Sequence, residues 1–137
     1  MKVYCEVLKK NKPITDLIIY SNTEVVKIIA ELLKINKTIS ELTIAIHAEE
    51  AEAIANTLIW NRTLTALNLT ASIIPNKGIR FISEALKVNK VLTILKLSEV
   101  EIDTGGAVAI SEALKVNATL TILDLSENAI DCEGAEL

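Results

Sequence analysis

Two segments of the chain are near-copies of each other, and they constrain the fold more than any other feature. The first, ISEALKVNKVLTILKLSE, begins at Ile82, and the second, ISEALKVNATLTILDLSE, begins at Ile110; the two differ at three positions. Internal repeats with a period of this length are typical of stacked architectures, in which one small unit recurs and buries its apolar face against its neighbours. The chain therefore predicts a linear stack of similar units.

The repeat extends toward the N-terminus with a change of length. Its first strand position recurs in five units, at Ile14, Ile39, Leu64, Leu92 and Leu120, so the earlier units are each three residues shorter than the later ones. Apolar residues three and five positions later complete the pattern L-x-x-L-x-L, with Ile or Leu at each site. The spacing of two between the last pair predicts a strand with one buried face.

A helix precedes each predicted strand. Apolar residues stand ten and six positions before the first strand position, as at Ile82 and Leu86, and a spacing of four places them on one helical face. Outward positions carry glutamate and lysine three residues apart, as at Glu84 and Lys87, which is typical of a solvated surface. Parallel strands pack more closely than helices, so we expect the sheet to form the concave face of a curved stack.

One asparagine stands between helix and strand in every unit. The column consists of Asn11, Asn36, Asn61, Asn89 and Asn117. Asparagine tolerates the left-handed backbone conformation that ends many helices, so we expect each of these residues to adopt it and stop the helix.

The loops from strand to helix carry residues suited to starting a helix. In the longer units we expect Asp103 and Asp131 to act as helix N-caps, with Asn76 as a candidate cap beside Pro75. We expect the glycines of these loops to permit a close approach of loop and helix; they are Gly78, Gly106 and Gly134. The shorter units have three residues fewer in this loop, and their helices should start near Thr23 and Ala48.

These patterns resemble the leucine-rich repeat. Residues 120–137, LTILDLSENAIDCEGAEL, match L-x-x-L-x-L-x-x-N-x-I-x-x-x-G, and the longer units, which contain a full helix, resemble the ribonuclease-inhibitor-like class. The resemblance implies an α/β solenoid: a curved, right-handed stack of strand–loop–helix units with a parallel sheet on the concave face and helices on the convex face. We expect a single domain over residues 1–137, with a helical stub over 1–11, units starting near 14, 39, 64 and 92, and a truncated unit over 120–137.

The family also implies a further column, eight residues after the first strand position, in which Asn or Cys joins neighbouring loops. Here the column contains Asn22, His47, Ser72, Val100 and Asn128. Because only the first and last conform, we expect an interrupted asparagine ladder with looser loops in the middle units. We expect His47 to pack within its loop rather than act as a ligand or base.

Composition excludes several classes of function. The net charge of -4 and the pI near 5.1 argue against a nucleic-acid partner, and no apolar stretch is long enough to predict a membrane-spanning helix, so we expect no membrane partner either. The N-terminus lacks the apolar segment of a signal peptide, so we expect a cytoplasmic protein, or one delivered into the cytoplasm of a host cell. Cys5 and Cys132 lie at opposite ends of the stack, where we expect small apolar side chains and no disulfide.

Catalysis is not expected. The sequence has one histidine, no glycine-rich phosphate loop, and no Ser or Cys beside a base, so we predict no catalytic residue, no metal site and no cofactor.

The predicted binding surface is the concave face. Its outward residues include Asp16, Ile18, Tyr20, Glu41, Thr43, Asn68, Ile94, Lys96, Ile122 and Asp124. Ile94 and Ile122 form an apolar pair flanked by Lys96 and Asp124, and Ile18 lies in a second apolar spot with Tyr20. Exposed apolar side chains rimmed by polar groups suit a protein contact, although exposed hydrophobic residues are also ordinary on protein surfaces.

The loops at the C-terminal end of the predicted sheet form an acidic edge. It contains Glu99, Glu101, Asp103, Glu127, Asp131 and Glu133. Such an edge either steers a basic partner toward the protein or is simply a solvated loop surface.

We therefore predict a module that binds a protein partner through the concave face and adjoining loops. The resemblance offers a microbial effector as one setting, which the composition rich in Ile, Lys and Asn favours. It offers a GTPase-activating protein of the Ran type as the alternative, for which the candidate arginines are Arg62 and Arg80. The ends lack polar capping units, so we expect either that the chain is part of a longer repeat array or that its ends associate head to tail with another copy.

Overall fold

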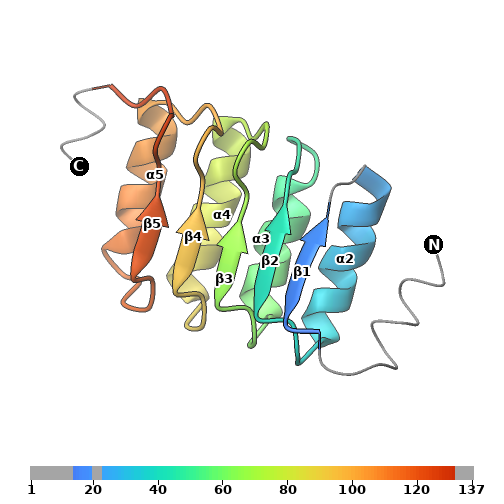
Figure 1. Cartoon of the computed structure of the whole chain (residues 1–137). Coiled ribbons are helices and arrows are strands. Elements are labelled where there is room, and N and C mark those ends of the chain that lie inside the picture. Colours follow the sequence, from blue (N-terminus) through green and yellow to red (C-terminus); the bar gives the residue numbers. More distant parts are fainter. Residues whose placement is uncertain (1–13, 20–22, 132–137) are drawn as a thin grey trace.

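Figure 1 shows a computed structural model of the chain, which describes residues 14–19 and 23–131. The described residues form five parallel strands in one sheet, ordered as in the sequence, and four helices that cover one face of it. The strands are β1 (Asp16–Ile19), β2 (Glu41–Ile44), β3 (Ala66–Asn68), β4 (Ile94–Lys96) and β5 (Ile122–Asp124). The helices are α2 (Thr23–Ile35), α3 (Ala51–Trp60), α4 (Asn76–Val88) and α5 (Thr104–Leu114). This arrangement confirms the predicted fold class.

The strands pair in the register that the repeat predicts. The central leucines of neighbouring strands lie side by side, and they are Leu17, Leu42, Leu67, Leu95 and Leu123. The register is unbroken between β2 and β3, which a short unit separates, and between β3 and β4, which a long unit separates. The alignment of short and long units is therefore correct.

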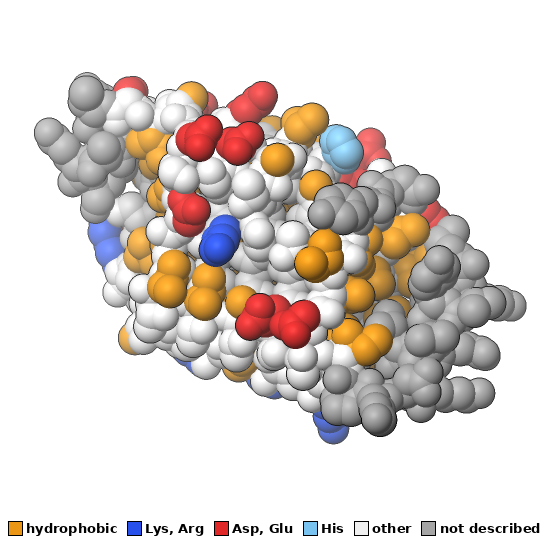
Figure 2. Space-filling view, viewed as in Figure 1, with side chains coloured by type: hydrophobic (Ala, Val, Ile, Leu, Met, Phe, Trp, Pro, Cys, Tyr) orange, Lys and Arg blue, Asp and Glu red, His pale blue; other side chains and the backbone are white. Residues whose placement is uncertain are grey.

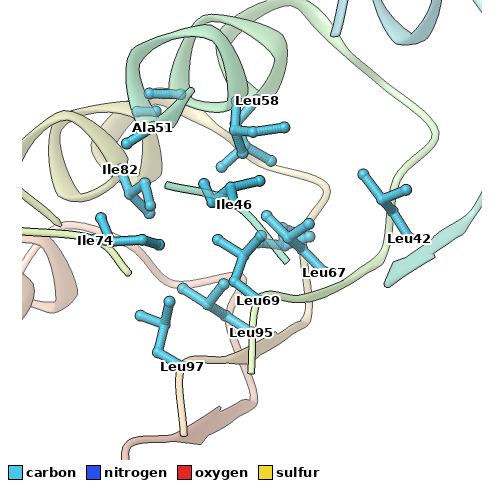
Figure 3. Packing of buried hydrophobic residues seen from close by; sticks show 14 of the residues in the cluster. Leu42, Ile46, Ala51, Leu58, Leu67, Leu69, Ile74, Ile82, Leu95 and Leu97 are labelled. Carbon is cyan, nitrogen blue, oxygen red and sulfur yellow. The ribbon is translucent and has the colours of Figure 1, made fainter. Parts of the chain in front are cut away.

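The core lies between the sheet and the helices (Figure 3). Leu67 and Leu95 are no more than 1% exposed, and they belong to one apolar cluster with Ile82 of α4 and Leu58 of α3. Burying a side chain of this size stabilises the fold by about 1.5–3 kcal/mol. Alternate strand residues point into this cluster, which leaves the other face of the sheet outward. We call that outward surface the sheet face.

One helix of the shorter units starts where predicted and the other does not. α2 begins at Thr23, as expected, but α3 begins at Ala51 and not at Ala48. The cause is a turn in which the Glu50 amide donates to the His47 carbonyl and the Glu50 carboxylate accepts from the His47 amide. Relative to the longer units, this unit therefore has a shorter helix and not a shorter loop.

Asp103 caps α5, as predicted, because its carboxylate accepts from the amides of Gly105 and Gly106 at 2.7 and 3.2 Å. The expectation for Asn76 is wrong. Asn76 is the first residue of α4, which has no side-chain cap, and its amide donates instead to Asp103 Oδ1 at 2.7 Å in the next unit. Asp131 is described, but Gly134 lies outside the described residues, as do the predicted N-terminal stub, Cys5 and Cys132.

Glycine is required where the loops meet the helices, as the sequence predicts. A Cβ atom on Gly78 would lie 2.6 Å from Ile74 Cγ2 and 2.8 Å from Ala51 Cβ, and one on Gly106 would lie 2.8 Å from Ile102 Cγ2. Real Cβ atoms do not approach so closely, so these glycines allow adjacent units to pack together.

The predicted conformation of the asparagine column is wrong. Asn61 and Asn89 have φ of −68° and −69° with extended ψ, not the left-handed conformation. In the described part of the chain, the non-glycine residues with positive φ lie in the loops after the strands, at Ala71, Glu99, Glu101 and Glu127.

The asparagine side chains explain why the column exists. Asn89 Oδ1 accepts from the amides of Val91 and Leu92 at 2.9 and 2.7 Å, while its Nδ2 donates to the Leu58 carbonyl of the preceding unit at 2.7 Å. Asn61 and Asn117 make the equivalent contacts in their own units. Each of these three asparagines therefore satisfies the start of its own strand and joins its unit to the one before it.

A hydroxyl column beside it was not predicted. Thr65, Thr93 and Thr121 each donate from Oγ1 to the carbonyl of the residue at the same position one unit earlier, at 3.0 to 3.2 Å. The sequence carries the signal, because Ser or Thr follows the first strand position in all five units.

The eighth column is partly as predicted. Asn128 Oδ1 accepts from the amides of Val100 and Ile102, and Ser72 Oγ accepts from the Ile46 amide, so different side chains join successive loops. The expectation for His47 is wrong, because its side chain is 63% exposed. Glu50 of the same loop is buried instead, because the loop turns it inward.

The outward helix faces carry the predicted glutamate–lysine pairs. Ion pairs join Glu31 to Lys34, Glu84 to Lys87, and Glu112 to Lys115. Within residues 14–19 and 23–131, no helix is long and apolar enough to cross a membrane.

Candidate protein-binding surface

The structure places nine of the ten predicted binding residues on the sheet face, and the tenth, Tyr20, lies outside the described residues. The nine occupy two rows that run across the strands. One row contains Asp16, Glu41, Ile94 and Ile122, with Ala66 between them, and the other contains Ile18, Thr43, Asn68, Lys96 and Asp124. Their role in binding stays a prediction.

The apolar part of the sheet face lies over β4 and β5 (Figure 2). Ile94 and Ile122 are register partners, Ile122 is 51% exposed, and Ile94 is half-buried. Neighbouring strands are about 4.8 Å apart, so the two side chains form one continuous apolar surface. Lys96 and Asp124 are partners in the adjacent row, and they bring a positive and a negative group to its border.

Asp124 is also part of a turn. Its Oδ1 accepts from the Ser126 hydroxyl at 2.6 Å and from the Ser126 amide at 3.0 Å. The hydrogen bond from the Ser126 side chain, followed by that from the amide, lowers the pKa of Asp124, and the charge of Lys96 lowers it further. Asp124 is therefore ionised at neutral pH, and Lys96 keeps its ammonium outside any ion pair with the other described residues.

Asn68 has the same local role in the third unit. Its Oδ1 accepts from the Thr70 amide at 3.0 Å, which fixes the turn after β3. Oδ1 of Asn68 and Oδ1 of Asp124 are thus each engaged in a turn. The side chains of Ile94, Ile122 and Lys96 have no such role, so they are the groups on this face best placed to meet a partner.

A second feature of the sheet face is acidic. Asp16 and Glu41 begin adjacent strands, are register partners and are both exposed, and Figure 2 shows this acidic group over the starts of β1 and β2. Two neighbouring carboxylates repel each other, and a lysine or arginine of a partner would relieve that repulsion. Ile18 is 62% exposed beside Thr43 in the next row.

The predicted acidic edge lies on the loops after β4 and β5, where Figure 2 shows a group of acidic side chains. Glu99, Glu101 and Glu127 are exposed there and have φ of 55°, 64° and 55°. A hydrogen bond from the Asn76 amide, together with those from the two backbone amides that it caps, lowers the pKa of Asp103. Asp131 is exposed in the same region, and Glu133 lies outside the described residues.

His47 and Glu50 bring two further titratable groups together in the loop before α3. His47 Nδ1 lies 4.0 Å from Glu50 Oε2. Burial raises the pKa of Glu50, but hydrogen bonding from Thr23 and the His47 amide outweighs burial, so the net direction is downward. Within the described residues, no group of three or more His, Cys, Asp and Glu side chains could hold a metal ion.

The arginines of the alternative function lie apart in the fold. Arg62 is in the turn after α3, whereas Arg80 is on the outward side of α4, and both are exposed.

Comparisons with known proteins agree with this geometry. Residues 116–137 match the family model described as Leucine Rich repeat. The whole chain is similar to a structure titled leiomodin-1 Actin-Binding Site 2, with a TM-score of 0.84, 28% sequence identity, and coverage of 96% of this chain and 80% of that chain. No curated protein sequence matches significantly.

A second similar structure is the tropomodulin C-terminal domain of Caenorhabditis elegans. Its TM-score is 0.82, with 14% identity and coverage of 98% of this chain and 86% of that chain. At this identity the likeness shows the fold alone.

Proposed function

The chain is a leucine-rich-repeat protein, and from this premise we propose that it is a protein-binding module whose contact surface is the sheet face and its adjoining loops. One observation carries the proposal: Ile94 and Ile122 lie together and outward, bordered by Lys96 and Asp124, on a face that no helix of the described residues covers. Apolar anchors with a polar rim are typical of protein contacts.

Actin is the first partner to test. The structure titled leiomodin-1 Actin-Binding Site 2 matches nearly the whole chain at 28% identity, so we propose that this chain binds actin through the equivalent fold. Co-sedimentation with filamentous actin, and binding to monomeric actin by fluorescence anisotropy, test the proposal directly. Absence of binding to both forms would remove actin and leave the partner class open.

The contact surface is tested by a matched pair of variants. Ile94→Asp combined with Ile122→Asp should weaken partner binding by more than about tenfold, because charges would replace the apolar anchors. Val108→Asp, on the outward side of α5 where the side chain is 41% exposed, should leave binding unchanged. If both variants bind as wild type does, the acidic edge or the helices become the contact surface.

Finer proposals have separate tests. The activator alternative is tested by measuring GTP hydrolysis by a small GTPase of the Ran type with and without this chain, with Arg62→Ala and Arg80→Ala as controls. A hydrolysis rate that the chain leaves unchanged would exclude this alternative. Localisation of a fluorescent fusion in the producing cell and in an infected host cell tests a cytoplasmic protein against a delivered effector. Sedimentation that shows a monomer at every concentration would exclude head-to-tail association.

A further inference from the structure

A row of exposed apolar side chains runs along the edge of the molecule where the helices end. Each lies immediately before an asparagine of the buried column, in four successive units, and the row consists of Ile35, Trp60, Val88 and Val116. Their exposed fractions are 68%, 66%, 53% and 56%. Packed helices are about 8–10 Å apart, so these residues form a line across the whole described stack. We call this border the helix-end edge.

Cations accompany the apolar row. The four turns of the helix-end edge, residues 34–41, 59–66, 87–94 and 115–122, contain one acidic residue, Glu41, and six basic ones: Lys34, Lys37, Arg62, Lys87, Lys90 and Lys115. Half of these six pair with a glutamate one helical turn earlier. Lys37, Arg62 and Lys90 form no ion pair with another described residue, so they set the charge of the edge.

The opposite edge has the opposite charge. The loops from strand to helix and the first turns of the helices carry one lysine, Lys77, against nine acidic residues: Glu24, Glu49, Glu50, Glu52, Glu99, Glu101, Asp103, Glu127 and Asp131. Figure 2 shows acidic side chains along the upper border of the molecule and basic ones along the lower border. The formal net charge of -4 therefore conceals a separation of charge between two edges.

Ordinary structural roles explain only part of this pattern. Lysines in the last turn of a helix interact favourably with the helix dipole, which accounts for Lys34 and Lys87. Lys90 also has such a role, because its Nζ donates to the Lys87 carbonyl in the last turn of α4 at 3.2 Å. These interactions do not account for Lys37 or Arg62 beyond the helices, nor for large apolar side chains in water beside them. Single exposed hydrophobic residues are ordinary, but here the same position is apolar and more than half exposed in every described helical unit.

We propose that the helix-end edge adsorbs to the surface of an anionic lipid bilayer. Aliphatic side chains and tryptophan between lysines and arginines suit the boundary of acyl chains and headgroups, where the cations meet lipid phosphates. The apolar groups form a projecting line along a border, which suits a planar surface. The acidic edge is repelled by the same lipids, so the two edges together fix the orientation of the protein.

We expected no membrane partner because no apolar stretch is long enough to span a bilayer, but adsorption to a bilayer surface requires no spanning helix. Adsorption through the helix-end edge leaves the sheet face free, because that face lies between the two edges. A partner bound to the sheet face would then be held beside the membrane.

Trp60 supplies the assay, since it is the one tryptophan in the sequence and lies in the proposed contact. The full chain is titrated with phosphatidylcholine vesicles that either contain phosphatidylserine or lack it. We expect the emission of Trp60 to shift to shorter wavelength with phosphatidylserine vesicles only, and the shift to decrease as salt is added. Co-sedimentation with the same vesicles gives an independent measure of binding.

Variants separate the edge from the rest of the surface. Val88→Glu with Val116→Glu keeps the reporter and should weaken binding by more than about tenfold, and Lys37→Glu with Lys90→Glu should do the same. The matched control Val108→Glu, in the middle of α5, should bind as wild type does, and circular dichroism checks that each variant folds. Ile94→Asp with Ile122→Asp should also bind vesicles normally, which keeps this test distinct from that of the sheet face.

Three outcomes would overturn the proposal. They are unchanged Trp60 emission with both kinds of vesicle, equal binding to neutral and anionic vesicles, and an equal loss of binding by Val108→Glu. A shift on addition of polyglutamate but not of vesicles would likewise replace the membrane with an acidic protein surface.

Discussion

Replacing Asn89 by alanine should remove a large part of the stability of the fold. The substitution leaves three backbone groups without partners: the amides of Val91 and Leu92 and the carbonyl of Leu58. Leu92 and Leu58 are fully buried, whereas Val91 is half-buried, so we count the Leu92 amide and the Leu58 carbonyl as the buried groups. An unsatisfied buried group costs about 1–3 kcal/mol, so two such groups predict a loss of about 2–6 kcal/mol. A domain of this size has about 5–15 kcal/mol in total.

The assay is urea unfolding followed by far-ultraviolet circular dichroism. Asn56→Ala is the matched control, because Asn56 is exposed on α3 and alanine is the better helix former, so its free energy of unfolding should change by less than about 0.5 kcal/mol. A loss below about 1 kcal/mol for Asn89→Ala would refute the role assigned to the column.

Asn89→Asp gives a second readout. The substitution keeps the acceptor for Val91 and Leu92 but places an oxygen where the amide donated to the Leu58 carbonyl, at 2.7 Å. Burial and that carbonyl should raise the pKa of the introduced acid above its unfolded value of about 3.9, since only the protonated form can donate. The variant should therefore be most stable below that value and lose stability as pH rises through the raised pKa. A pH profile identical to that of Asn89→Ala would contradict this geometry.

Three further perturbations test other contacts. Gly106→Ala should lower the free energy of unfolding in urea by about 1–3 kcal/mol, because its Cβ would lie 2.8 Å from a side-chain carbon of Ile102. Gly105→Ala should lower it less, because its Cβ would meet movable polar atoms at 3.2 Å or more. Equal losses for the two variants would argue against close packing at Gly106. The lowered pKa of Asp103 means that its contribution to stability is complete above its unfolded pKa of about 3.9 and is lost as pH falls through the folded value, so Asp103→Asn should show a shallower acid-side decline in the urea midpoint. Lys87→Ala should change the free energy of unfolding by less than about 0.5 kcal/mol, since its ion pair is exposed, and a larger loss would mean that the pair supports the packing of α4.

The sequence predicts the fold well because burial leaves a periodic trace. Residues such as Leu95 and Ile82 must be apolar at strand and helix spacing, so the strands, the helix faces and the outward row of the sheet are predictable from one chain. The conformation of Asn89 was not predictable from its position alone, because asparagine can end a helix through its backbone or through its side chain. The periodicity shows that an amide is required there, and the structure shows which of its capacities is used.

The surface was predicted less completely. The sequence identifies Asp124 as outward, but its hydrogen bonds to Ser126 depend on a turn that periodicity does not specify. Glu50 was missed because the loop alignment assigned the inward position to His47, three residues earlier. The apolar position of Val88 and its equivalents repeats visibly in the sequence, but the repeat alone does not show that these side chains face water.

The unequal lengths of the units have a consequence for how such a chain can change over evolutionary time. β2 and β3 keep their register although α3 is three residues shorter than α4 of the longer unit, and the difference lies entirely at the start of α3. The turn that contains Asn61 is unaffected, so the contacts of this turn with the neighbouring units do not depend on where α3 begins. Small insertions and deletions can thus accumulate in the loops from strand to helix and in the first turns of the helices, while the strands and the asparagine turns keep their spacing. Duplication of a whole unit then requires only that the strand and the asparagine turn be retained.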